Sequence, residues 1–379
     1  MKTKKIVVGL FCSMIILMGC QPDQRTEKMK ESTEAEAVQV TSGASAATNA
    51  TSVKQEEQTN TNDQPKESAA KVSYERNGHT FEVDAVSGAT VEANNGQSGI
   101  SPEEKAQKMY WSGRPEIGEV QGDYYHHEVV FDGGYTALID VVVKDQQIQL
   151  VEFDERGPKN YYSEEWAGVT KRLSGYANFQ ANNARTDQSL VTVVNTMTFL
   201  ENQMVAENRL DGAFQTAKGQ SNSANNGYLP AARALAKEIK EPSKEHYTSL
   251  TEDFGEGLSG RLTVITLKDS GKITDLRYDE YFADTEEEIK DAKLKAYSRQ
   301  SKYFSKDYAQ KSGENFKKEV DDLRKKAIEE NKLVSPTNEE AWSENYQRLV
   351  KKITSQKIKK TAEEGKLRQF FLVFHEGNF

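Results

Sequence analysis

The amino-acid sequence predicts an α+β fold, arranged as two tandem units behind a long disordered tether. Three observations indicate this. A strand–turn–strand pattern around residue 144 recurs around residue 268. Each copy is followed by stretches whose apolar residues have helical spacing. Residues 21–71 hold no aromatic residue and too few apolar residues to form a core, so we expect them to be disordered.

The first 19 residues have the pattern of an export signal. Three lysines lie within the first five residues, and residues 6–18 are almost wholly apolar. This apolar run is shorter than the roughly 20 residues that a permanent membrane helix needs. It leads into Leu17-Met18-Gly19-Cys20, which resembles the lipobox of bacterial lipoproteins. The resemblance implies cleavage before Cys20 and attachment of diacylglycerol to its thiol as a thioether.

We therefore expect lipid on Cys20 to hold the mature chain at the extracellular face of the cell membrane. Two or more acyl chains, such as palmitate, hold a protein durably, whereas one chain does so only marginally. The other cysteine, Cys12, leaves with the signal, which excludes a disulfide and a thiolate metal site in the mature chain. The net charge of −9 becomes more negative when the basic signal is removed, and this argues against nucleic-acid binding.

The expected tether, residues 20–71, consists mainly of Gln, Thr, Ser, Glu, Ala and Asn. By coil statistics, about 50 such residues reach roughly 40 Å. That reach would carry the folded part into or through a cell wall, as in a surface lipoprotein of a Gram-positive bacterium.

The two α+β units are expected over residues 122–241 and 247–355, each with a small antiparallel sheet and helices. In both, an apolar strand runs into a Lys-Asp turn, and the next strand ends in an aromatic residue, Asp and Glu, which is a hairpin signal. The matching residues are Lys144, Asp145, Ile148, Phe153, Asp154 and Glu155, and in the second unit Lys268, Asp269, Ile273, Tyr278, Asp279 and Glu280. The recurrence after 124 residues favours two copies of one module over two unrelated hairpins.

Helical spacing of apolar residues predicts helices in both units. The expected helices cover residues 190–204, a segment from Pro230 onward, and residues 285–297, 316–331 and 339–353. The tail, residues 356–379, carries an apolar patch at 370–374 that suits either an added edge strand or an exposed end.

One motif, in the segment 72–121 ahead of both units, has a chemical interpretation. It reads Asp84-Ala85-Val86-Ser87-Gly88-Ala89-Thr90, a strand that runs into a glycine-containing turn with two hydroxyls. It resembles the flavinylation site of FMN-binding domains, where a separate transferase links FMN through a phosphoester to the last hydroxyl. The resemblance implies Thr90 as the acceptor, Gly88 and Ala89 as a narrow turn, and Asp84 and Ser87 in the recognised segment.

The two-unit pattern also resembles the tandem FMN-binding lipoproteins of Gram-positive bacteria, over roughly residues 72–355. Proteins of that family accept electrons from a membrane quinone oxidoreductase and pass them to extracellular acceptors. Related lipoproteins are sex-pheromone precursors, whose cleaved signal peptides act as short hydrophobic signals. The resemblance implies that residues 10–19 could supply such a peptide.

The sequence departs from the family pattern where each repeat normally carries the flavin motif, just before its last helix. The first unit has Leu210-Asp211-Gly212-Ala213-Phe214 there, and Phe214 offers no hydroxyl, while residues 333–339 of the second unit lack Gly-Ala. Two functions therefore stay open. One is an extracytoplasmic electron carrier with covalent FMN on Thr90. The other is a surface binding or structural lipoprotein without flavin, whose signal peptide is released as a pheromone.

Other conspicuous residues favour structural roles, and no nucleophile–base group indicates a catalyst. His126 and His127 would point to opposite faces of a strand, so they cannot chelate one metal ion. The acidic runs at 286–288 and 321–322 suit solvated helix faces. The three tryptophans suit packing, although one of them, Trp111, could also cover a flavin ring: they are Trp111, Trp166 and Trp342.

Overall fold

The computed structural model describes residues 70–87, 111–161, 163–181, 192–217, 222–336 and 340–355. All of these lie in one compact part of the chain, residues 65–379. The predictions for the signal, Cys20, nearly all of the tether and the tail fall outside the described residues. So do Gly88, Ala89 and Thr90 of the motif.

Six antiparallel strands form the central sheet, in the order β5-β4-β3-β7-β8-β9. Their bounds are β3 Gly118–Phe131, β4 Tyr135–Lys144, β5 Gln147–Arg156, β7 Glu245–Gly255, β8 Leu258–Leu267 and β9 Ile273–Phe282. The predicted hairpins β4–β5 and β8–β9 are both present. The prediction of a separate sheet in each unit is wrong, because β3 and β7 pair along Gly118–Asp123 and join the two meanders edge to edge.

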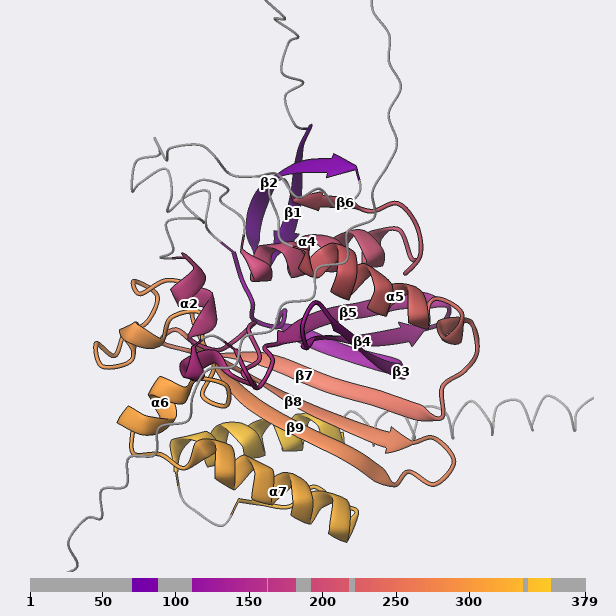
Figure 1. The fold of residues 1–379 in the computed structure, drawn as a ribbon. Coiled ribbons are helices and arrows are strands. Elements are labelled where there is room, and N and C mark those ends of the chain that lie inside the picture. The colour runs from indigo at the N-terminus through magenta and orange to yellow at the C-terminus, as the bar shows by residue number, and fades with distance from the viewer. Residues whose placement is uncertain are drawn as a thin grey trace, which may run out of the picture. The chain divides into compact units, whose positions relative to one another are not determined.

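This sheet folds back on itself. Directly paired residues share a face of a sheet, and the register places Tyr124, Val142, Tyr247 and Ile265 on one face. These four side chains form one buried cluster. We call this face the inner face. Arg261 on β8 pairs with Glu152 on β5, and Arg277 on β9 pairs with Asp140 on β4, although these strands are not neighbours in the sheet. The three strands β3–β5 and the three strands β7–β9 therefore lie as two layers, as Figure 1 shows.

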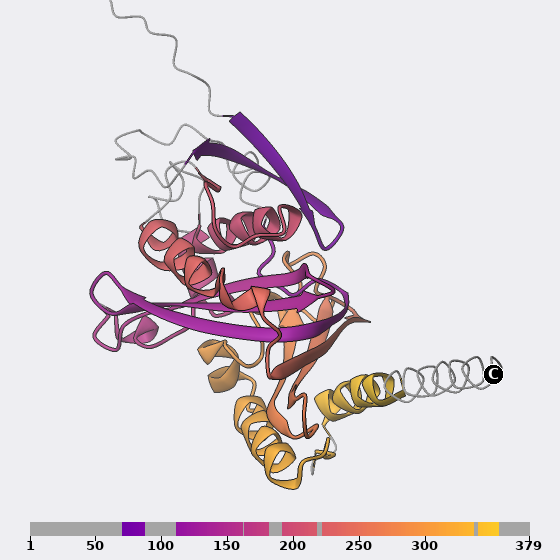
Figure 2. The same ribbon diagram turned by 90° about the vertical axis from the view of Figure 1, so that its right-hand side faces the viewer.

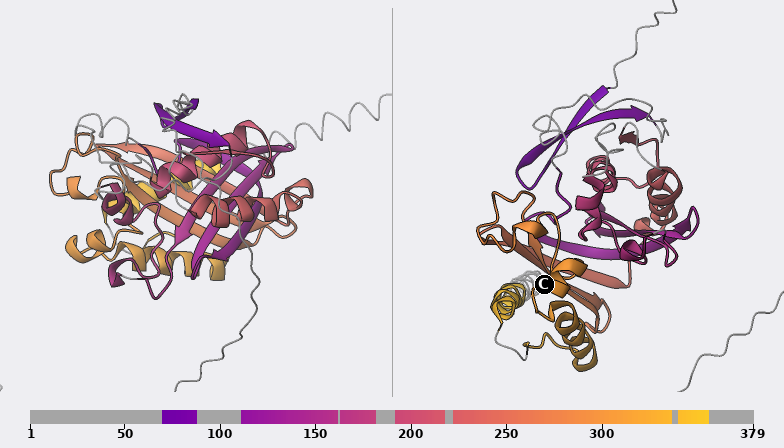
Figure 3. Two further views of the ribbon diagram at one scale, coloured as in Figure 1. Left: turned by 45° about the horizontal axis from the view of Figure 1, so that its top comes forward. Right: turned by 60° about the vertical axis from the view of Figure 1, so that its left-hand side comes forward.

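Helices cover the outer face of each layer. Helices α4 (Val193–Ala206) and α5 (Leu229–Leu235) pack on β3–β5, whereas α7 (Phe316–Glu330) and a helix over 341–355 pack on β7–β9. The two helical layers lie on opposite sides of the folded sheet (Figures 2 and 3). These helices match the predicted ones within a few residues. Shorter elements are η1 Glu164–Trp166, α2 Tyr176–Ala181, η2 Ser223–Tyr228, η3 Glu238–Lys240, η4 Lys295–Tyr297 and α6 Lys306–Lys311.

The helix predicted over residues 285–297 is wrong. The segment consists of turns and ends in η4. The N–H of Lys290 donates to the carbonyl of Glu256, in the turn between β7 and β8, and just before the segment the N–H of Ala283 donates to the carbonyl of Gly257. Tertiary hydrogen bonds thus replace the local bonds that a helix would have made.

A second, three-stranded sheet has the order β1-β2-β6, with β1 Ala70–Arg76, β2 His79–Ser87 and β6 Gln215–Ala217. Figure 1 shows it above α4. Tyr74 of β1 fixes the sheet to this helix, because its ring packs against Phe199 and its hydroxyl lies 2.7 Å from that of Thr198. Burial raises the pKa of Tyr74 to about 12, so the hydroxyl is protonated at neutral pH. The segment ahead of the first unit is therefore part of the same fold.

An asparagine closes each hairpin in the same way. Asn208 follows α4 and Asn331 follows α7, and both have a φ of 52°. The Oδ1 of Asn208 accepts the Ile148 N–H at 2.8 Å, and that of Asn331 accepts the Ile273 N–H at 2.7 Å. Asparagine suits both positions because it tolerates the left-handed region and offers a short acceptor.

We expect Asn331→Ala to lower the free energy of unfolding by about 1–2 kcal/mol, because the Ile273 N–H loses its acceptor and alanine disfavours a positive φ. Asn331→Gly should lose less, since glycine accepts the backbone conformation. Denaturant unfolding measures both. Equal stability of the wild type and the two variants would show that neither the bond nor the conformation contributes.

Candidate functional site

The flavinylation-like motif begins as the end of β2. The backbone of Asp84 pairs with Lys71 of β1, and Ser87, the last residue of the strand, pairs with Gln215 of β6. The acceptor suggested by the resemblance, Thr90, comes three residues after the strand ends and is outside the described residues. The structure therefore places the first half of the motif and does not test the second half.

The neighbouring strand β6 directly follows Leu210–Phe214, the segment in which the first unit lacks the motif. Phe214 is buried, and the guanidinium of Arg209 lies 5.4 Å from the centre of its ring. The end of β2, which holds Asp84–Ser87, thus pairs with β6, the strand that follows Leu210–Phe214. The sequence alone did not indicate this pairing.

A buried charge network lies beneath this sheet. Glu201 on α4 forms ion pairs with Arg172 and Arg76, and its Oε1 accepts the N–H of Phe153 on edge strand β5 at 2.7 Å. Arg172 also donates to the carbonyl of Gly113 at 2.8 Å. Burial acts to lower the pKa of Arg172, but the carboxylates around it outweigh burial and raise that pKa above its usual value. The network joins α4, β1, β5 and the segment before β3.

The aromatic-Asp-Glu pattern that marked the repeat builds equivalent clusters in the two halves. In the first, Glu155 is buried, pairs with Lys171 and accepts the Tyr228 hydroxyl at 2.8 Å. In the second, Glu280 is buried and lies 3.0 Å from the ammonium of Lys302. Glu280 also accepts from Asn345 at 2.9 Å and from the Tyr278 hydroxyl at 2.6 Å, residues from two different elements.

The aspartate that precedes each of these glutamates accepts hydrogen bonds from backbone N–H groups. Asp154 Oδ1 accepts the N–H groups of Glu155, Lys171 and Arg172. Asp279 Oδ1 accepts those of Glu280 and Tyr303, at 2.8 and 3.0 Å. Both aspartates lie on the inner face of the sheet, as the register shows.

Two ion pairs cross the space between the two layers of the sheet. Arg261 on β8 binds Glu152 on β5 in a bidentate pair at 2.6 and 2.9 Å. Arg277 on β9 binds Asp140 on β4 at 2.6 Å. Burial acts to raise the pKa of Glu152, but Arg261 outweighs burial and lowers that pKa to about 2. Asp140 is likewise held well below its usual pKa, by Arg277 and by hydrogen bonds from His126 and Tyr124.

A cavity of about 510 Å³ lies beside these pairs. We call it the inner cavity. It is lined by Asp154 and Arg172 from the first half and by Asp279, Tyr303 and Arg324 from the second. Its size is in the range of small-molecule sites. In the sequence the two aspartates are visible as repeat markers only, because nothing local indicates that they face one cavity.

Burial raises the pKa of Asp279 to about 7 and that of Asp154 to about 6. The Ser301 hydroxyl and backbone N–H groups act in the opposite direction on Asp279, as backbone N–H groups do on Asp154. A raised folded-state pKa favours the protonated carboxyl. The stabilisation of the fold by the protonated carboxyl is complete below the pKa of the unfolded chain, about 4. It is lost as the pH rises through the pKa of the folded state.

We therefore expect Asp279→Asn, which is uncharged at every pH, to gain melting temperature relative to the wild type as the pH rises from 5 to 8. Asparagine keeps the Oδ1 acceptor for the two N–H groups. Asp307→Asn, at an exposed site on α6, is the control and should show no such trend. A constant difference in melting temperature between D279N and the wild type across this pH range would contradict the prediction.

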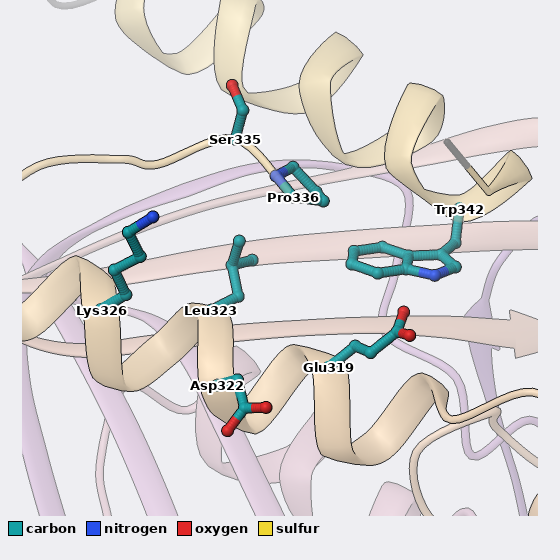
Figure 4. A pocket seen from close by; sticks show the side chains of 7 residues that line it. All are labelled: Glu319, Asp322, Leu323, Lys326, Ser335, Pro336 and Trp342. Carbon is teal, nitrogen blue, oxygen red and sulfur yellow. The ribbon is translucent and has the colours of Figure 1, made fainter. Parts of the chain in front are cut away.

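A smaller cavity of about 100 Å³ lies between α7 and the segment 333–336 (Figure 4). Trp342 forms one wall, with Leu323 and Pro336 beside it and the carboxylates of Glu319 and Asp322 on α7. A space of this size holds a few water molecules.

The three tryptophans are buried, as the packing interpretation predicted. One face of the Trp111 ring is taken by the guanidinium of Arg299, 4.0 Å from its centre. The Nδ1 of His126 on β3 lies 2.6 Å from Asp140, and the hydrogen bond that His126 donates to this carboxylate raises the pKa of His126. In the described parts of the chain, no group of three or more His, Cys, Asp or Glu residues could hold a metal ion.

Comparisons with family models, curated proteins and solved structures find no match for this chain. Within the described ranges, no helix has both the length and the apolar character needed to cross a membrane.

Proposed function

We propose that this chain is a lipid-anchored surface protein that carries FMN covalently on Thr90 and passes electrons outside the membrane. The observation that carries the proposal is the pairing of β2 with β6. The first four residues of the motif, Asp84–Ser87, lie on β2, beside the strand that follows the segment where the first unit departs from the family pattern. The strand ends at Ser87, so the rest of the motif follows a fixed strand end, as a segment presented to a transferase would.

We also propose that the two halves of the folded part are related FMN-binding-like units. Support comes from equivalent contacts: the asparagines that close the hairpins, and the buried Glu–Lys clusters. Tyr124 and Tyr247, at matching positions on β3 and β7, stack with ring centres 5.7 Å apart. In this account the second unit is a scaffold, and a membrane quinone oxidoreductase is the electron donor that the family resemblance implies.

Covalent flavin is tested by expressing the full chain with and without a flavin transferase of the FMN-linking class. The membrane fraction is denatured and separated on a gel. The proposal predicts a fluorescent band only when the transferase is present, because a covalent flavin survives unfolding and a bound flavin leaves. A dark band in both samples would remove the electron-carrier proposal.

The lipid anchor is tested separately. We expect Cys20→Ala to move the protein from the membrane fraction to the soluble or uncleaved pool, because the thiol that would carry the diacylglycerol is gone. Cys12→Ala, within the signal, should leave membrane retention unchanged. If a cleaved form of the Cys20 variant stays on membranes as firmly as the wild type after high-salt washing, the chain is not a lipoprotein of this kind.

A second candidate function is a surface binding protein without flavin, whose released signal peptide acts as a pheromone. The inner cavity favours the binding part of this alternative, since it is the size of a small-molecule site. The transferase experiment separates the two candidates.

A further inference from the structure

The charged groups of the inner cavity are unevenly matched. Its arginines already have carboxylate partners: Arg261 binds Glu152, Arg277 binds Asp140, and Arg324 binds Asp275 at 2.6 Å. Arg172 is held by Glu201, and Arg156 by Glu128. An anionic ligand would have to displace one of these carboxylates. The guanidinium groups therefore do not form a ready anion site.

Two carboxylates of the cavity lack a cation. Among the described residues, neither Asp154 nor Asp279 forms an ion pair, although both line the cavity. Asp279 is 6 % exposed, and its Oδ1 is used by two backbone N–H groups. Its Oδ2 is buried, and among the described residues no donor meets hydrogen-bond geometry with it. Burying a carboxylate without a cation is costly, and an ammonium held in the cavity would offset that cost.

Aromatic rings line the cavity beside these carboxylates. Tyr303 and Phe304 lie edge to face with ring centres 4.9 Å apart, and Tyr281 lines the same space. The Tyr303 ring already attracts an ammonium, because the Nζ of Lys317, a residue of α7, lies 3.4 Å from the centre of that ring. Carboxylates together with aromatic faces are the surroundings that favour an organic cation.

We propose that the inner cavity binds a small organic cation, whose ammonium lies beside the carboxylate of Asp279, with Asp154 as the second carboxylate. The counts of charge agree with this ligand class. The lining holds Arg156, Arg172, Arg261, Arg277, Arg324 and His126 against Glu128, Asp140, Glu152, Asp154, Asp279 and Asp321. Two of the arginines are further balanced by Glu201 and Asp275, just outside the lining. This binding does not depend on the flavin.

The test is calorimetric titration of the full mature chain, made without a flavin transferase, with 1,4-diaminobutane as the probe. We expect saturable binding to the wild type. Asp279→Asn removes the charge and keeps the Oδ1 acceptor, so it should weaken binding about 30-fold or more. Asp154→Asn should weaken binding as well. Asp307→Asn changes the net charge equally at an exposed site and should bind like the wild type.

Failure of this test is distinguishable from failure of the flavin proposal, because the protein used carries no flavin. Absence of probe binding to the wild type would overturn the inference. So would saturable binding of inorganic phosphate or magnesium ions in place of the diamine. If D279N does not fold, as judged by circular dichroism, D154N decides the matter, and an unchanged affinity of D154N overturns the assignment.

Discussion

Replacing Thr90 by valine is expected to abolish covalent flavin completely. The proposed bond is a phosphoester, which needs a side-chain hydroxyl, and valine removes that hydroxyl at nearly unchanged volume. Thr90→Ser keeps the hydroxyl and should retain flavin. The measurement is the fluorescence of the denatured protein at equal loading, after co-expression with the transferase.

Two controls make this result specific. Thr80 is an exposed residue of β2, the strand that leads into the motif, and lies seven residues before the end of that strand. Thr80→Val should therefore keep the flavin. The melting temperature of Thr90→Val should equal that of the wild type, which separates loss of the acceptor from loss of the fold. Full fluorescence in the valine variant would assign the bond to another residue and contradict the role of Thr90.

Glu201→Ala is expected to lower the free energy of unfolding by about 3–5 kcal/mol, the usual cost of leaving a buried charge without its partner. The variant leaves the guanidinium of Arg172, which is 2 % exposed, without its carboxylate partner. It also removes the acceptor of the Phe153 N–H on β5. It also releases Arg76, whose contact with Glu201 holds β1 on α4. Alanine favours the helix, so the loss cannot come from helix propensity.

The matched control for this prediction is Glu207→Ala at the end of the same helix. Glu207 is exposed and pairs only with Arg209 across the surface, so its removal should change the stability by less than about 0.5 kcal/mol. Chemical denaturation of both variants gives the comparison. Similar losses for Glu201→Ala and Glu207→Ala would show that the buried network contributes no more than a surface pair.

Local patterns in the sequence identified the hairpins well. Asp145 and Gln146, both at positive φ, form the tight turn that the Lys-Asp pattern predicted between β4 and β5. The same holds for the helices with regular apolar spacing. The pairing of β3 with β7 could not be predicted in this way, because β strands choose partners through contacts that are distant in sequence. The turns at 285–297 were missed for the same reason: the N–H groups of Ala283, just before them, and of Lys290 bond to Gly257 and Glu256, which are distant in sequence.

The candidate sites were predictable only in part. The motif was visible as a string of residues, yet its position beside β6 depends on the folded chain. Asp154 and Asp279 were visible as repeat markers, while the inner cavity that they share arises because the sheet folds back on itself. Glu201 and Arg172 gave no sequence signal, since a buried ion pair between a helix and a loop has no characteristic spacing.

The most direct test of the central claim is the mass of the tryptic peptide that contains Thr90, which spans residues 77–105 between Arg76 and Lys105. The protein would be purified from cells that express the transferase. The proposal predicts a peptide heavier than its sequence by one FMN less one water, with fragment ions that place the addition on Thr90. A peptide at its unmodified mass, from cells in which another known substrate of the same transferase is flavinylated, would contradict the claim.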